Sequence, residues 1–146
     1  MRQPIISRIS RLCCLLLLLL LTAQFTLAAE VYIVAHRDVV DKELSKKTVE
    51  RIFLGKKTRW SNGDQLIPVM LKSGELHERF VRRMLSRDAT QFNTYWKQAV
   101  FTGRGLPPKS FDTLNEMLDY IADTPGAVGY CAFPPGNEAI IVLQIR

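Results

Sequence analysis

The spacing of hydrophobic positions after residue 30 alternates between two patterns, and each predicts a different kind of element. Nearly continuous apolar runs at 31–35 and 66–71 are typical of strands that are buried on both faces. A run of small residues at 127–132 and a closing apolar run at 139–145 predict two further strands. Because the side chains of 127–132 are small, we expect a neighbouring element to approach this strand closely.

Between these strands, apolar residues repeat at helical spacing and predict four helices. The first is short, with Ser45 as its N-cap and Gly55 as its C-terminal stop. The second runs roughly over 74–86, and the fourth is capped either by Ser110 or by a box formed by Thr113 and Glu116. The expected core faces are Val49, Ile52 and Phe53; Leu76, Phe80, Val81, Met84 and Leu85; Phe92, Trp96, Ala99 and Val100; and Phe111, Leu114, Leu118, Ile121 and Ala122.

This order of elements, β-α-β-α-α-α-β-β, predicts an α/β sandwich with helices packed on a central sheet. Among the connections, 56–64 is a basic loop that ends in an Asn-Gly turn, and 106–110 is a stiff surface segment. The three cations around Trp60 could grip an anionic or sugar ligand, but a loop whose indole packs on the sheet is favoured. The polar residues at 36–38 follow the first strand, where α/β sheets tend to place ligands, although a solvated loop is the simpler interpretation.

The first 29 residues have the composition of a secretory signal peptide. Three arginines precede an apolar core at 12–21, and small residues at 26–29 offer a cleavage site. The apolar core is too short to span a bilayer comfortably, so we expect cleavage and a periplasmic domain over 30–146. That domain keeps only Cys131, which cannot form an internal disulfide, and its size suits one hydrophobic core.

Removing the leader also changes the charge of the chain. The full sequence carries +6, and the loss of three leader arginines leaves 17 basic against 14 acidic residues. This mild excess fits attraction to small anions, and it lacks the concentrated basic patch of a nucleic-acid-binding protein.

The strand at 66–71 gives way at once to the second helix, and this junction is the candidate binding site. Ser73 can cap the helix with its hydroxyl, and Gly74 lets the backbone approach a ligand. The first N–H groups of a helix have no partner within it, and the helix dipole is positive there, so an oxyanion could be held. The alternative is an ordinary capped helix that binds nothing. The candidate ligand-binding residues are Lys72, Ser73, Gly74, Glu75 and Arg79.

Catalysis and metal binding find little support in the sequence. The only histidines, His36 and His77, are far apart, and no second histidine or acid stands near His77 at ligand spacing. We therefore interpret His77 as a partly covered helix residue, and the i, i+4 pairs Glu75–Arg79 and Glu78–Arg82 as structural. No serine, histidine and acid have the order of a hydrolase, so neither an enzyme nor a cofactor is expected.

Three motifs together resemble a known family. They are the stretch 44–63 with Leu54-Gly55 and Trp60-Ser61-Asn62-Gly63, the Ser73-Gly74 junction, and 125–130 with the sequence Pro-Gly-Ala-Val-Gly-Tyr. This combination resembles the phosphate-binding proteins of bacterial ABC transporters and, more narrowly, the second lobe of their two-lobed type II periplasmic binding fold. The resemblance implies a single-lobe, three-layer-like α/β sandwich that captures phosphate or a similar oxyanion and works with an ABC permease or another envelope protein.

Two departures from the family pattern limit this implication. In the family, a Ser-Gly-Thr at a helix start binds phosphate, whereas here Glu75 replaces the threonine. A carboxylate about 5 Å from the anion costs on the order of 3 kcal/mol at an effective dielectric of about 20, unless Lys72, Arg79 or the basic loop around Trp60 offsets it. The partner lobe is also missing, so a phosphate would stay half solvated unless two chains pair or another protein covers it. An exported interaction module that keeps the lobe without its ligand, and docks through 56–60 or 107–108, is the alternative.

Overall fold

The computed structural model describes residues 30–146, so the predicted signal peptide lies outside the described residues. The described part contains six strands and four helices. Their bounds are β1 Tyr32–His36, β2 Glu43–Leu44, α2 Lys46–Phe53, β3 Ile67–Leu71, α3 Glu75–Leu85, α4 Ala89–Phe101, β4 Lys109–Phe111, α5 Leu114–Asp123, β5 Ala127–Cys131 and β6 Ile140–Ile145. No helix among them is long and apolar enough to cross a membrane.

The strands form one mixed sheet in the order β2-β6-β1-β5-β3-β4. Strand β1 runs antiparallel to both of its neighbours, β5 and β6, while β3 runs parallel to β5 and β4. The carboxyl ends of β3, β4 and β5 therefore meet at one edge of the sheet, and the carboxyl end of β1 lies at the opposite edge. This arrangement decides which polar segments can share a site.

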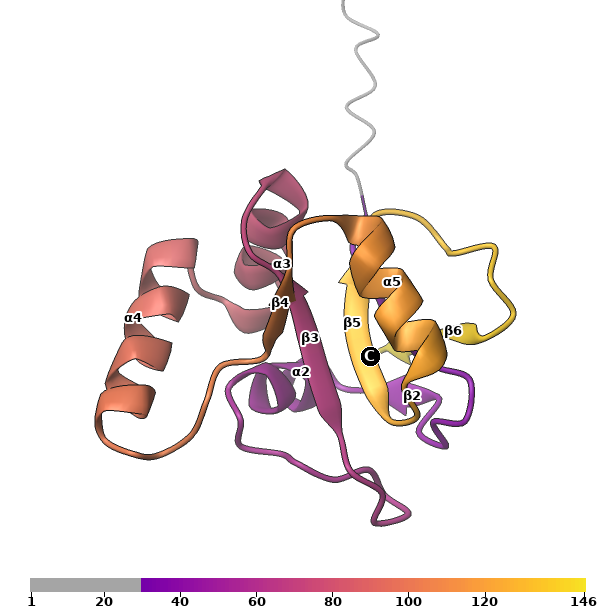
Figure 1. The fold of residues 1–146 in the computed structure, drawn as a ribbon, viewed down its shortest axis with the longest axis horizontal. Helices are drawn as coiled ribbons and strands as arrows, with labels where there is room; N and C mark the ends of the chain where they lie inside the picture. The colour runs from indigo at the N-terminus through magenta and orange to yellow at the C-terminus, as the bar shows by residue number, and fades with distance from the viewer. Residues whose placement is uncertain (1–29) are drawn as a thin grey trace, which may run out of the picture.

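Helices cover both faces of the sheet, which confirms the predicted α/β sandwich. Helix α5 packs on one face, over β5 and its neighbours (Figure 1). A Cβ atom on Gly129 would lie only 2.8 Å from Ile121 Cδ1, so the small residue in β5 lets α5 approach, as predicted. The next side chain along β5, Tyr130, points to the other face and stacks on Phe80 of α3, with 3.9 Å between the ring centroids.

Helices α2 and α3 pack together on that second face, and α4 lies outside them, against α3 (Figure 1). Phe53 of α2 meets Phe80 edge to face, with 4.6 Å between centroids. The predicted caps of two helices are confirmed, because Ser45 accepts the N–H of Thr48 and Thr113 forms a capping box with Glu116. Burial raises the pKa of Cys131 to about 11, in keeping with an unreactive core thiol.

Several predictions about single elements are wrong. The short strands β2 and β4 were not predicted, and β4 lies partly in the predicted surface segment at 106–110. Two or three residues are too few to show a period-2 pattern, and pairing with β6 and β3 makes them strands. Val100 was expected in the core but is 47% exposed, because α4 is covered by other elements on one side only.

Candidate functional site

The junction between β3 and α3 is built from backbone groups at the carboxyl edge of the sheet. The N–H of Lys72 donates to the carbonyl of Phe111 at 2.9 Å, which ties the end of β3 to the end of β4. Gly74 then turns the chain with φ 103°, and a Cβ atom placed there would meet nothing within 4 Å. The backbone at Gly74 is therefore exposed to open space, as an approaching ligand requires.

Helix α3 begins at this exposed turn with unfilled N–H groups. Gly74, not Ser73, is the N-cap residue, and no side chain caps the helix, so the predicted Ser73 cap is wrong. The physical reason is the positive φ of Gly74, which moves the helix start one residue along the chain. Among residues 30–146, the N–H groups of Glu75, Leu76 and His77 have no hydrogen-bond acceptor. Three donors consequently point out of the helix end beside the exposed side chain of Ser73.

The predicted charged residues lie around this end but are paired with one another or with neighbours. Glu75 accepts from Arg79 Nη1 at 3.0 Å, and its side chain is 83% exposed. Its carboxylate is therefore turned toward the next helical turn and does not fill the helix end. The Nε of Arg79 is buried without a partner among the described residues. Lys72 Nζ lies 2.7 Å from Asp112 Oδ2.

Asp112 is a site residue that sequence reasoning missed. It follows β4 directly, and β4 runs parallel to β3, so Asp112 and Lys72 emerge at the same edge of the sheet. An anion at the end of α3 would have to compete with this carboxylate for the ammonium of Lys72. The sequence carried no usable signal, because β4 itself was not predicted.

A buried polar pair, Tyr130 and His77, holds the junction between β3 and α3 in place from the core side. The hydroxyl of Tyr130 accepts the N–H of Leu71 at 3.0 Å and lies 2.7 Å from His77 Nδ1. Since the oxygen already accepts from Leu71, its proton is free to be donated to Nδ1 of a neutral imidazole. Burial lowers the pKa of His77, which favours this neutral form, and raises that of Tyr130.

His77 is therefore buried, with 3% of its surface exposed, and not partly covered as predicted. It lies in the first turn of α3, and Leu71 is the last residue of β3. One tyrosine hydroxyl thus holds the strand end and the helix start together, which limits movement of the three N–H donors.

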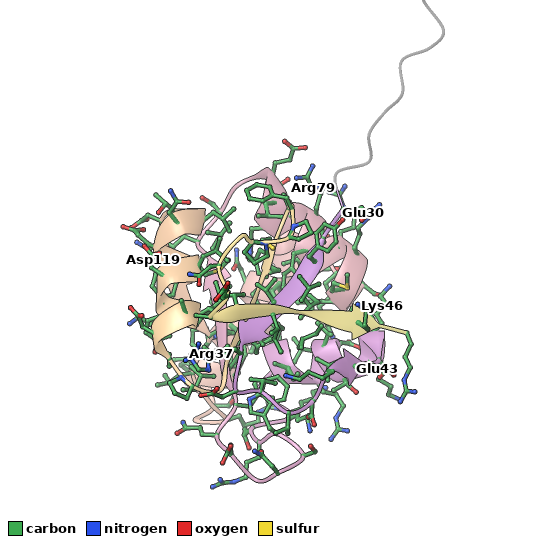
Figure 2. All side chains as sticks on the ribbon, turned by 90° about the vertical axis from the view of Figure 1, so that its right-hand side faces the viewer. Glu30, Arg37, Glu43, Lys46, Arg79 and Asp119 are labelled. Atoms are coloured by element: carbon green, nitrogen blue, oxygen red, sulfur yellow. The ribbon has the colours of Figure 1, made fainter. Side chains whose placement is uncertain are left out.

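Two other polar segments are far from this junction. The residues after β1, His36, Arg37 and Asp38, lie at the opposite edge of the sheet because β1 is antiparallel to β5. Figure 2 shows Arg79 at the upper end of the molecule and Arg37 well below it. Thr58 accepts the N–H of Leu66 at 3.0 Å, so the basic loop lies at the start of β3.

About six residues separate that end of β3 from Lys72, roughly 20 Å along a strand. The prediction that the loop around Trp60 could offset Glu75 is therefore wrong. Trp60 instead has the structural role that was favoured, since it is 3% exposed and its indole N–H donates to the carbonyl of Gly126 at 3.0 Å. Among residues 30–146, no group of three or more metal-ligating side chains occurs.

No protein-family model matches the chain, and no curated protein is significantly similar to it in sequence. Among solved structures, it matches a candidate phosphate ABC transporter substrate-binding protein from Clostridium perfringens with bound phosphate. The TM-score is 0.62 at 13% identity, over 79% of this chain and 44% of that one.

Two further solved structures give the same result. An ABC-type phosphate transport receptor from Vibrio cholerae matches with a TM-score of 0.61 at 14% identity, over 79% of this chain and 45% of that one. PstS from Borrelia burgdorferi matches with a TM-score of 0.60 at 8% identity, over 80% of this chain and 47% of that one.

The fold is therefore that of one lobe of phosphate ABC transporter substrate-binding proteins, as the sequence motifs predicted. The chain spans less than half the length of each of these structures. At such low identity the likeness concerns the fold alone.

Proposed function

We propose that residues 30–146 form an exported oxyanion-binding domain that takes phosphate or a similar anion at the start of α3, in phosphate uptake or sensing. The observation that carries this proposal is the set of three N–H groups, at Glu75, Leu76 and His77, that have no acceptor among the described residues. Such donors at the positive end of a helix dipole favour an anion. The structural neighbour from Clostridium perfringens contains bound phosphate, which agrees with this ligand class.

Each predicted residue has a separate role in this proposal. Ser73 supplies a hydroxyl and Gly74 supplies an exposed backbone, while Lys72 and Arg79 supply positive charge. Glu75 opposes binding, but its carboxylate is exposed and paired with Arg79, so water and the guanidinium screen it.

Binding by this surface alone should be weak. The donors lie at an exposed edge, so a phosphate held there keeps part of its hydration, and a tight site would need donors from an opposing surface. We infer that a second chain, an ABC permease or another envelope protein supplies that surface. The domain binds its ligand and releases it unchanged, without a cofactor.

Isothermal titration of the purified domain with phosphate and with sulfate tests the proposal. We expect measurable heat with a dissociation constant on the order of 0.1–1 mM, and loss of several-fold in affinity for Ser73→Ala. The matched control is Thr94→Ala, which removes an exposed hydroxyl from α4 and should leave binding unchanged. Absence of heat at about 10 mM phosphate would exclude the proposed site.

The Lys72–Asp112 ion pair allows a second, directional test. Asp112→Asn leaves the lysine without its carboxylate partner and should strengthen phosphate binding, whereas Lys72→Gln should weaken it. If both substitutions change the affinity in the same direction, the ammonium of Lys72 does not contact the anion.

A second candidate function, an exported interaction module, has one specific observation in its favour. Three apolar side chains near the end of α4 and in the following loop are exposed. The exposed fraction is 92% for Phe101, 79% for Leu106 and 47% for Val100. Val100 and Phe101 line the same surface hollow, and neighbouring exposed apolar side chains often mark a protein contact. Capture of an envelope protein that is lost in Phe101→Ser and retained in Ser73→Ala would favour this function; equal capture by both variants would count against it.

A further inference from the structure

A cavity lies at the other end of β3 from the proposed oxyanion site. It has a volume of about 470 Å³, is partly open to solvent, and is lined by α2, the start of β3, α4 and the loop that follows α4. Ile67 and Pro68 line it, whereas none of the residues from 72 to 79 does. The volume is within the usual range for small-molecule sites, roughly 300–1,000 Å³. The cavity is therefore large enough for a ligand of its own.

The indole of Trp96 forms part of the cavity wall and has an unfilled donor. Trp96 is 7% exposed, and its N–H group is buried with no hydrogen-bond partner among residues 30–146. Buried indole N–H groups usually find an acceptor, as Trp60 does with the carbonyl of Gly126. Because this nitrogen has almost no accessible surface, it is sealed from the cavity, and the ring carbons of Trp96 form the wall.

Gly55 makes room for this indole ring, and Gly105 lies in ordinary contact with it. A Cβ atom on Gly55 would lie 2.9 Å from Trp96 Cη2, and one on Gly105 would lie 3.7 Å from Cζ3. Gly55 follows α2 and Gly105 follows α4, so both segments close on the same aromatic edge. The ring consequently lies against the backbone on two sides, most closely at Gly55.

The charged side chains that line the cavity are all basic. Lys57 and Arg104 line it, and neither forms an ion pair with a carboxylate within the described residues. Lys109 also lines it, but its ammonium lies over the ring of Tyr120, 4.4 Å from the centroid. No aspartate or glutamate of residues 30–146 lines the cavity. An anionic group is therefore the charged group that fits there.

The rest of the lining is largely apolar. Its apolar residues come from α2 and the residue after it, the end of the loop before β3, α4 and the loop before β4; among them are Ile52, Leu54, Leu66, Ala99, Leu106, Pro107 and Pro108. Thr58, Gln65 and Gln98 are the uncharged polar residues of the lining. The hydroxyl of Tyr95 donates to the carbonyl of Leu54 at 2.7 Å and is already satisfied. An inorganic anion would leave this apolar surface without a contact, whereas an anion with a hydrocarbon or aromatic body would cover it.

We propose that this cavity binds a small organic carboxylate. Its carboxylate lies toward Lys57 and Arg104, and its apolar or aromatic body covers the prolines, the aliphatic wall and the ring of Trp96. The site is separate from the start of α3 and does not depend on phosphate binding there.

The test follows the two indole N–H signals of the ¹⁵N-labelled domain by NMR while phenylacetate is added. The chain has two tryptophans, and Trp96→Phe assigns the signals by removing one of them. We expect phenylacetate to shift the Trp96 signal and leave the Trp60 signal in place. Lys57→Gln and Arg104→Gln should each weaken binding by about threefold to fivefold. Lys56→Gln, an exposed neighbour that does not line the cavity, is the matched control and should have no effect.

Three results would overturn the proposal: no shift of the Trp96 signal at about 10 mM phenylacetate, an equal shift with the neutral phenylacetamide, or an equal loss of affinity in Lys56→Gln. Phosphate titrations of the same variants keep the two sites distinguishable. If the oxyanion proposal fails and this one holds, phosphate gives no response while phenylacetate still shifts Trp96. Ser73→Ala should leave the response to phenylacetate unchanged.

Discussion

Replacement of Glu75 by threonine should strengthen phosphate binding and weaken the fold, and these opposite signs make it an informative perturbation. Glu75 is the first residue of α3 and stands beside the unfilled N–H groups. The substitution removes a negative charge and adds a hydroxyl. It also leaves Arg79 without its carboxylate partner, which now lies 3.0 Å away.

The size of the effect follows from Coulomb's law. At about 6 Å from a bound anion, a carboxylate costs roughly 0.7 kcal/mol at a dielectric of about 80 and roughly 3 kcal/mol at about 20. Because the Glu75 side chain is 83% exposed, the lower end applies. A gain of about 1 kcal/mol corresponds to roughly fivefold tighter binding.

The same substitution should lower the stability of the fold. An acid in the first turn stabilises a helix through its dipole by about 0.3–1 kcal/mol, and an i, i+4 ion pair adds about 0.3–0.5 kcal/mol. Both contributions are lost in Glu75→Thr, so Tm should fall by a few degrees while affinity rises. A general change in folding could not produce both results.

The assay is isothermal titration with phosphate at low ionic strength, where screening is weak, together with a thermal melt. Glu75→Gln separates the charge from the added hydroxyl, and Glu78→Gln is a matched control because it removes an exposed carboxylate one turn nearer the middle of α3. Unchanged affinity in Glu75→Thr, or an equal gain in Glu78→Gln, would refute the placement of the anion at the start of α3.

Three further predictions concern the support of this site and the packing of α5 on the sheet. Tyr130→Phe removes the acceptor of the Leu71 N–H and should lower the free energy of unfolding by about 1–3 kcal/mol, measured by urea denaturation; an unchanged midpoint would contradict the role of the hydroxyl. Because burial lowers the pKa of His77 below its usual 6.5, the unfolded chain takes up this proton first as the pH falls, so Tm should decrease below about pH 6.5. His77→Gln should reduce this fall of Tm at low pH. If Tm depends on pH in the same way with and without the substitution, His77 does not cause the fall. Gly129→Ala forces a Cβ atom against α5 and should cost about 1–3 kcal/mol, whereas Gly136→Ala, which meets nothing within 4 Å, should be nearly neutral.

The sequence predicted the parts of the fold that have strong local periodicity. Helix α2 is an example, because its cap at Ser45 and its three buried residues follow the expected pattern. The four longer strands were also predicted, three of them from apolar runs and β5 from a run of small residues. In contrast, β2 and β4 become strands only by pairing with distant segments, and no local pattern encodes that pairing.

The candidate site also has a part that local sequence patterns predict and a part that depends on distant segments. Its position at the end of β3 followed from the change of hydrophobic spacing, and the structure places Lys72, Ser73, Gly74, Glu75 and Arg79 together there. The partners that decide its electrostatics, Asp112 and the Tyr130 hydroxyl, come from segments 40 and 59 positions further along the chain. Such contacts depend on the order of the strands, which single-sequence reasoning could not supply.

The most direct measurement is a phosphate titration followed by the backbone amide signals of the domain in ¹H–¹⁵N NMR spectra. An anion at the start of α3 predicts saturable shifts of the Glu75, Leu76 and His77 amides, with little change elsewhere in the described part of the chain. Phosphate that leaves these three amides unmoved, or that shifts another surface instead, would contradict the proposed site.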